Sequence, residues 1–325
     1  MTIEDVDAAR SPWRTRTITI DNGVLRFALF PDLGGRIFSL VHQPTGKEIL
    51  WRNPSLDPAQ ARAGAFDDCW TGGWDELFPN DEAATLGATA YPDHGELWTA
   101  RWYCEVQRPD TLYLRTETPA SRCQVEKWIA FNDGEERIRF RHRLQNLSGQ
   151  SLSYLWKLHP ALAVSPGDSI LIPAGRLRLE PEFRGSLGGG PLEWKGPILA
   201  LPDRTVDLRV VPSAASREVY FFYGLDLQEG WCAAYDPARR LAVGLAFPRD
   251  LFTSCWLFAS YGGWRDHYVA VLEPSTAYPF RLEQAAASGQ CAVLPPQGCQ
   301  QAEVVFSARS GVGGVSRIAP DGEIY

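Results

Sequence analysis

The sequence predicts an all-β protein, built as a large antiparallel β-sandwich with few short helices. Short runs of alternating apolar and polar residues dominate the chain, and they are rich in Val, Ile, Tyr, Trp and Thr. Turn residues such as Asp21-Asn22-Gly23 and Asn132-Asp133-Gly134 separate the runs, whereas long amphipathic helix patterns are scarce. Because 325 residues suit one large sandwich, we expect a single domain over residues 1–325.

The alternating runs predict strands along the whole chain. In the first half they cover residues 15–20, 24–30, 36–42, 98–107, 112–118, 123–131 and 137–144. In the second half they cover residues 151–158, 206–211, 218–223, 230–235, 241–247, 254–259, 268–272 and 302–307. Short helical pieces are expected at 58–64 and 276–288, and the Gly-, Pro- and Leu-rich segment 175–203 is expected to be a long loop.

Composition narrows the function classes. The net charge of −7 and the absence of a basic run argue against a nucleic-acid partner. No stretch of about 18 apolar residues is present, so we expect no membrane span. The seven cysteines form no Cys-x-x-Cys pair and the N-terminus lacks an apolar leader core, which favours a reduced, cytoplasmic protein without a bound metal. The 12 tryptophans can fill a β core or stack on sugar rings.

A first group of polar and aromatic residues follows two glycines. Gly72-Gly73 precede Trp74, Asp75, Glu76 and Asn80, and Asp93-His94-Gly95 come soon after. A sugar site needs this mixture, because polar groups bind hydroxyls while flat rings pack on the CH-rich face. The alternative is a loop in which Asp and Asn side chains cap turns.

A second candidate is His159, which shares a strand face with Lys157. Pro160 removes a backbone donor, so the strand is expected to end at His159 and to direct the imidazole into a cleft. A hydrogen-bonded histidine in the core or at a sheet edge is the alternative.

A third candidate is Glu273, which ends the apolar run 268–272. A carboxyl group buried at that point acquires a raised pKa, as a general base near neutral pH requires. The alternative is a carboxylate that caps the turn at Ser275-Thr276. Motifs for a serine nucleophile elbow, a phosphate loop, a dinucleotide fold or a zinc hydrolase are absent from the sequence.

Taken together, several motifs resemble those of the aldose 1-epimerase (galactose mutarotase) superfamily. They are Gly34-Gly35-Arg36, Asp93-His94-Gly95, Leu158-His159-Pro160 and Leu272-Glu273-Pro274, in an order and spacing that extend from about residue 24 to about residue 306. The resemblance implies a sandwich with a small-molecule carbohydrate bound across one concave sheet, and no cofactor.

The resemblance also implies a mechanism and roles for the site residues. Glu273 would take the proton of the anomeric hydroxyl, His159 would protonate the ring oxygen, and His94 would hydrogen-bond the sugar. Trp74, Asp75, Glu76, Asn80 and Lys157 would contact the substrate. Thr71 stands where the hexose-6-phosphate branch has an arginine, which weakens a phosphorylated-sugar interpretation.

Three alternatives remain open at this point. One is an epimerase of a phosphorylated or anionic sugar, with Arg101 or Arg265 as the anion partner. Another is a carbohydrate-binding module without turnover, since a shared fold does not fix function. A glycoside hydrolase using Asp75 and Glu273 is the third. The sequence does not specify an oligomeric state.

Overall fold

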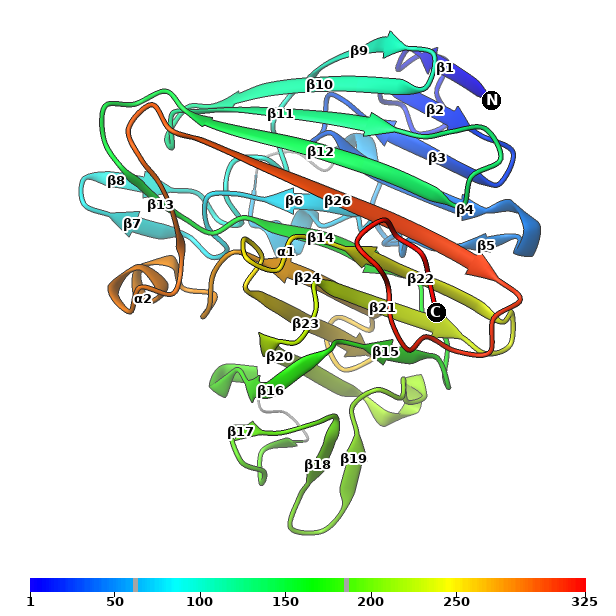
Figure 1. Ribbon diagram of the computed structural model, residues 1–325, viewed down its shortest axis with the longest axis vertical. Helices are drawn as coiled ribbons and strands as arrows, with labels where there is room; N and C mark the ends of the chain where they lie inside the picture. Colours follow the sequence, from blue (N-terminus) through cyan, green and yellow to red (C-terminus); the bar gives the residue numbers. More distant parts are fainter. Residues whose placement is uncertain (61–63, 184–186) are drawn as a thin grey trace.

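The computed structural model describes residues 1–60, 64–183 and 187–325. Its main body consists of two β-sheets, one of 12 strands and one of eight, and every pairing between strands of these sheets is antiparallel (Figure 1). The only two α-helices within the described residues are short, α1 (Phe66–Cys69) and α2 (Leu282–Ala287). The architecture is the antiparallel β-sandwich with few short helices that the sequence predicts.

The larger sheet carries the residues of interest at its centre. Its strands run in the spatial order β1 (Thr2–Val6), β2 (Thr17–Asp21), β3 (Leu25–Phe30), β4 (Arg36–His42), β6 (Trp74–Leu77), β14 (Lys157–Leu162), β24 (Tyr268–Ser275), β23 (Ser254–Tyr261), β20 (Glu218–Leu227), β16 (Ala174–Leu179) and β17 (Glu193–Trp194), and β5 (Lys47–Glu48) pairs with β4.

The smaller sheet covers one face of the larger one. Its order is β15 (Ser169–Leu171), β21 (Trp231–Asp236), β22 (Leu241–Ala246), β26 (Cys299–Ser310), β12 (Arg137–Asn146), β11 (Cys123–Ala130), β10 (Thr111–Thr118) and β9 (Tyr103–Arg108). Three two-stranded pairs lie outside the main sheets: β7 (Ala84–Leu86) with β8 (Thr89–Tyr91), β13 (Leu152–Tyr154) with β25 (Ala292–Leu294), and β18 (Ile198–Ala200) with β19 (Thr205–Asp207). Among the described residues, 3₁₀ turns include η1 (Gln43–Thr45), η2 (Pro58–Gln60), η3 (Pro181–Phe183) and η5 (Ala214–Ser216).

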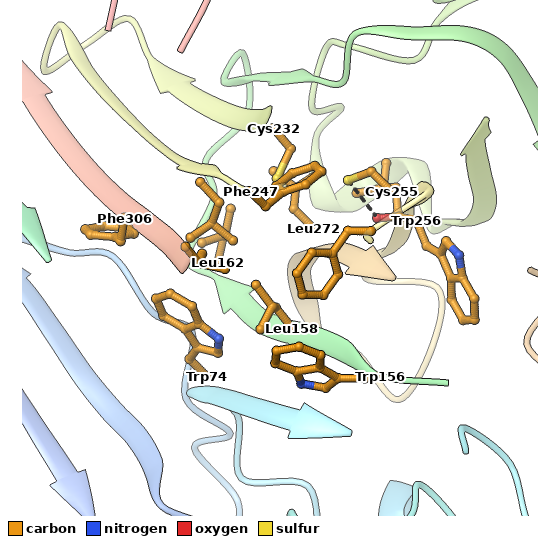
Figure 2. Packing of buried hydrophobic residues seen from close by; sticks show 14 of the residues in the cluster. Trp74, Trp156, Leu158, Leu162, Cys232, Phe247, Cys255, Trp256, Leu272 and Phe306 are labelled. Carbon is orange, nitrogen blue, oxygen red and sulfur yellow. Dashed lines mark hydrogen bonds between the residues drawn. The ribbon is translucent and has the colours of Figure 1, made fainter. Parts of the chain in front are cut away.

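The core lies between the two sheets. Trp74 of β6 packs against Phe140 of β12 and Phe306 of β26, with ring centroids 4.8 and 6.0 Å apart. Leu158 and Leu272 belong to the same buried cluster (Figure 2). Because successive side chains of a strand point to opposite faces, the residues next to these core residues face the other side of the larger sheet. Asp75, His159 and Glu273 are such residues.

Four expectations need correction. Residues 175–179 form most of strand β16, which lies between β20 and the edge strand β17, and not a loop. Residues 74–77, expected in a loop-rich segment, form β6. Strand β14 continues through Pro160. Proline has no backbone N–H to donate, but the residues of β14 between Lys157 and Ala161 do not pair with β24, so the missing donor does not interrupt that pairing. Of the helical piece expected at 58–64, residues 58–60 form a 3₁₀ turn and residues 61–63 lie outside the described residues.

Across the described parts of the chain, no helix has the length and apolar character needed to cross a membrane. All seven cysteines are free thiols.

Candidate active site

A cavity of about 280 Å³ opens on the face of the larger sheet that is turned away from the core. Four residues singled out from the sequence, His94, Lys157, His159 and Glu273, line this one cavity although they come from distant parts of the chain. The remaining lining is aromatic and acidic: Phe66, Asp67, Trp70, Asp81, Glu82, Asp93, Phe183, Phe221, Phe258, Trp264 and Phe280. Flat apolar walls with a few convergent polar groups are typical of small-molecule sites.

The strand register explains why three polar side chains meet at the floor. His159 of β14 lies directly opposite Asp75 of β6. On its other side, the pairs Lys157–Ser275 and Ala161–Val271 share one register, which places His159 across from Glu273 of β24. Asp75, His159 and Glu273 therefore form a row across three adjacent strands and point to the same face.

Lys157 and Glu273 form a buried ion pair at one side of the cavity. The side chains of Lys157 and Glu273 are 3% and 1% exposed, and Nζ of Lys157 contacts the Glu273 carboxylate directly. The same Nζ lies 2.9 Å from Oδ1 of Asp81 and 4.6 Å from the centre of the Trp256 ring. Burial alone would lower the pKa of Lys157, but the two carboxylates outweigh it and raise that pKa. The ammonium group therefore stays charged.

Glu273 has the environment expected of a general base. Burial raises its pKa above the ordinary 4.5, and the Asp81 charge adds to this rise, while Lys157 opposes it. The net rise moves the pKa of the carboxyl group toward neutral pH, where a general base is most effective.

His94 comes from a loop, unlike Lys157, His159 and Glu273, which lie on strands. Its φ of 57° is in the left-handed region, and its ring stacks on Phe66 with centroids 3.8 Å apart. Nδ1 lies 2.8 Å from Oδ1 of Asp93, and Nε2 lies 3.7 Å from Oδ1 of Asp81. The stack and the contact with Asp93 fix the plane of the imidazole, which lines the cavity.

His159 lies between aromatic rings at the floor. Phe66 and Trp70 both meet it edge-on with centroids 5.7 Å away. Burial lowers its pKa well below 6.5, and the positive charges of Lys157 and Arg36 act in the same direction. The imidazole of the free protein is therefore neutral at pH 7.

Trp74 and Glu76 do not reach the cavity, so the sugar contact expected of them does not fit the structure. Both point into the core, because the alternation of β6 turns only Asp75 and Leu77 to the other face. The Glu76 carboxylate lies 2.5 Å from Nζ of Lys127 and 3.1 Å from Nε2 of His142. Burial would raise the pKa of Glu76, but these two groups outweigh it and lower that pKa.

Asp75 and Asn80 support the site without lining it, so their expected direct contact with a sugar also does not fit. Asp75 is fully buried, and its Oδ1 accepts a hydrogen bond of 2.5 Å from Nε of Arg36. Asn80 donates from Nδ2 to the backbone carbonyls of Glu82 and Pro92, both at 2.7 Å. Asn80 thus ties the chain after β6 to the loop that carries His94.

Sequence reasoning missed Asp81 and the aromatic walls. Asp81 directly follows Asn80 in an acidic segment, which was a usable signal. The wall residues Phe66, Trp70, Phe258 and Trp264 are far apart in the sequence and share no pattern, so only the packed structure brings them together.

The two arginines proposed to bind an anion lie outside the cavity. Arg101 is 78% exposed in its side chain and lies 3.5 Å from Asp32. Arg265 pairs with Asp68 at 2.8 Å. Within residues 1–60, 64–183 and 187–325, no group of three or more His, Cys, Asp and Glu side chains is arranged to hold a metal ion.

Replacing Gly95 by alanine should destabilise the loop that carries His94. Gly95 has a φ of +72°, and an added Cβ would lie 2.3 Å from the carbonyl oxygen of Phe78. We expect the free energy of unfolding to fall by about 2–5 kcal/mol, from left-handed strain together with overpacking. Gly87→Ala is the matched control, since Gly87 has a φ of +60° with open space around it. Equal losses in the two variants, measured by urea unfolding, would contradict the close approach.

Replacing Glu76 by glutamine tests its structural role. The change leaves Lys127 buried without its carboxylate, so unfolding free energy should fall by about 3–5 kcal/mol at neutral pH. Because folding lowers the pKa of Glu76, the stability that it contributes is present above its ordinary value of 4.5 and is lost as the pH falls through the lower folded value. The variant should therefore lose less stability in acid than the wild type does. Glu303→Gln, at an exposed position of β26, should change stability by no more than about 0.5 kcal/mol.

No family model matches the chain, and no curated protein matches its sequence at a significant level. Solved structures do match it. The Slr1438 protein from Synechocystis sp. PCC 6803 is 19% identical with a TM-score of 0.67, over 91% of this chain and 96% of that one. A protein from Escherichia coli K12 described as a candidate aldose 1-epimerase is 15% identical with a TM-score of 0.67, over 90% and 98%. A galactose mutarotase-like protein from Clostridium acetobutylicum is 11% identical with a TM-score of 0.65, over 95% and 99%. The chain therefore has the fold of the galactose mutarotase-like proteins.

Proposed function

We propose that the protein is an aldose 1-epimerase-type isomerase, in which the whole chain acts as one sugar-binding domain. The observation that carries the proposal is the convergence of His94, His159 and Glu273 on one aromatic-walled cavity. A base and an acid side by side on the floor of a sugar-sized hollow suit the opening of a hemiacetal ring.

In the proposed reaction Glu273 takes the proton from the anomeric hydroxyl. The bond between C1 and the ring oxygen breaks, and the ring oxygen takes a proton from the imidazolium form of His159, which is the minor form in the free protein and becomes neutral imidazole as it donates. Rotation about the C1–C2 bond presents the other face of the aldehyde. The same steps in reverse close the ring as the opposite anomer and return both protons. His94, fixed by Phe66 and Asp93, hydrogen-bonds the sugar.

The charges around the cavity favour a neutral sugar over a phosphorylated one. Asp67, Asp81, Glu82, Asp93 and Glu273 line the cavity, and Lys157 is the single lysine or arginine among the described lining residues. The ammonium of Lys157 is already engaged by the carboxylates of Asp81 and Glu273. A phosphate group brought into this hollow would meet an excess of negative charge.

Saturation-transfer NMR on a panel of neutral aldoses and their 6-phosphates tests the proposal. We expect the wild-type protein to accelerate anomer exchange for at least one neutral aldose and to leave the phosphates at the uncatalysed rate. Sugar binding without acceleration would favour the carbohydrate-binding module. Acceleration confined to the phosphates would overturn the charge argument.

The activity should fall in acid with an apparent pKa above 4.5. Glu273 acts as a base only when it is deprotonated, and burial raises its pKa from that ordinary value. The rate therefore rises with pH as the carboxyl group ionises. The measurement is kcat/KM against pH for the sugar that is turned over fastest. An acidic limb at or below 4.5 would assign the base to a more exposed carboxyl group.

A further inference from the structure

One carboxylate in the lining of the cavity has no partner within the described residues. Asp67 lines the cavity from α1, and its side chain makes no hydrogen bond and no ion pair there. Each of the other four acidic side chains of the lining contacts a basic side chain: Asp81 and Glu273 contact Lys157, Glu82 contacts Arg281 and Asp93 contacts His94. The charge of Asp67 is therefore available to a ligand.

Aromatic rings stand next to this carboxylate. Asp67 directly follows Phe66 and lies three residues before Trp70 at the end of α1, and both rings line the same cavity. The centroid of the Trp70 ring lies 6.0 Å from that of Phe66 and 6.2 Å from that of Trp264, which also lines the cavity. Aromatic faces attract cations, and carboxylates form their strongest hydrogen bonds with charged N–H donors. This combination is typical of sites that bind an ammonium group.

We propose that the cavity binds an aldose that carries a protonated amino group, and that Asp67 is the partner of that group. The carboxylate accepts hydrogen bonds from the ammonium, and the rings of Trp70 and Trp264 pack against it. Glu273 and His159 at the floor are left for the anomeric hydroxyl and the ring oxygen. The inference names the substrate class of the same cavity and so rests on the proposed function, but ammonium binding itself requires no turnover.

The electrostatics at Asp67 support this assignment. Burial raises the pKa of Asp67, although the guanidinium of Arg265 acts against this rise. Arg265 is already engaged, because it lies 2.8 Å from Asp68 and 5.1 Å from the centre of the Trp264 ring. A ligand cation beside Asp67 would stabilise the ionised carboxylate more than a neutral hydroxyl at the same place.

The floor of the cavity also has an unpartnered polar side chain. Within the parts of the chain that the structure describes, the imidazole of His159 makes no hydrogen bond, although the residue is 5% exposed and lines the cavity. Buried polar groups are almost always hydrogen-bonded, so a polar ligand is expected here. An amino aldose brings both the hydroxyls that such a floor needs and the positive charge that suits Asp67.

Equilibrium binding of matched sugars tests the inference. The probes are 2-amino-2-deoxy and 6-amino-6-deoxy aldoses of the gluco and galacto series, each compared with its parent aldose by NMR titration at about pH 6.5, where an amine with a pKa of about 8 is protonated. We expect at least one amino sugar to bind about 10–100-fold more tightly than its parent, the usual gain from a hydrogen bond to a charged group. Its N-acetylated form should lose this advantage, because acetylation removes the charge. If no amino sugar binds more tightly than its parent, the inference is overturned.

A charge-removing variant identifies the partner of the ammonium. Asp67→Asn should reduce the ratio of the two affinities to about threefold or less, since the amide keeps the size of the side chain but not its charge. Asp250→Asn is the matched control, because it removes one negative charge from an exposed position outside the cavity, and it should leave the ratio unchanged. The wild-type ratio in Asp67→Asn, or an equal fall in both variants, would overturn the assignment to Asp67.

Turnover separates this inference from the proposed function. Preferential binding of an amino sugar by a protein that never accelerates anomer exchange would refute the epimerase and leave the ammonium site intact. Anomer exchange of neutral aldoses without any preference for amines would refute the ammonium site alone.

Discussion

Replacing Glu273 by glutamine should slow anomer exchange by about 10²–10⁴-fold, the usual effect of removing a general base. The side chain is 1% exposed, lines the cavity and has its pKa raised by burial. Glutamine keeps the shape and can still hydrogen-bond a hydroxyl, but it cannot accept the anomeric proton. We therefore expect kcat to fall while sugar binding persists, as measured by saturation-transfer NMR and by titration of the cavity tryptophan fluorescence.

The matched control for this variant is Glu303→Gln, an exposed carboxylate of β26. It should leave the rate of anomer exchange unchanged. If Glu273→Gln keeps the wild-type rate, another carboxylate must be the base. Asp81 would then be the next residue to test, because it lies near both His94 and Lys157.

Replacing Lys157 by methionine should lower the free energy of unfolding by about 3–5 kcal/mol at neutral pH, because it leaves two buried carboxylates without their cation. Asp81 and Glu273 both meet Nζ of this lysine. Loss of the ammonium also removes the group that lowers the pKa of Glu273, so that pKa rises further. Less of the base is then ionised at neutral pH, and the exchange rate should fall as well.

The pH dependence of this variant has a definite sign. A carboxyl group whose pKa is raised by folding binds its proton more tightly in the folded state, so its unfavourable effect grows as the pH rises. Urea unfolding at about pH 5 and about pH 7.5 should therefore show the larger loss at the higher pH. Lys195→Met, at an exposed position, should change stability by no more than about 0.5 kcal/mol. An equally small loss in Lys157→Met would show that the ion pair contributes little.

Much of the fold could be predicted from the sequence because some strands of the smaller sheet have one face packed on the core and the other face turned to solvent. Strand β12 alternates between inward residues such as Phe140 and outward arginines, and the predicted start at residue 137 agrees with the structure. Strand β10 (Thr111–Thr118) alternates in the same way and contains the predicted run 112–118. In such strands apolar and polar residues alternate with the period of two that strand geometry imposes, so the sequence alone reveals the strand.

The candidate residues could also be chosen from the sequence, because their types were unusual for their positions. His159 precedes a proline in an apolar strand, and Glu273 ends an apolar run. Each feature is locally costly unless the fold supplies a partner or a task. That reasoning pointed to His94, His159 and Glu273, and the structure brings all three to one cavity.

Only the tertiary structure decided which neighbours of these residues face the cavity. All four residues of β6 and all six of β14 are buried, so no alternation of apolar and polar residues marks the two faces. Register and sheet order placed Asp75 opposite His159 on one face and directed Glu76 to the other face, where it contacts Lys127. The sequence by itself determined an antiparallel sandwich and the residues with the chemistry. Which charges meet, such as Lys157 with Glu273, depended on packing between strands more than 100 residues apart, which no local pattern encodes.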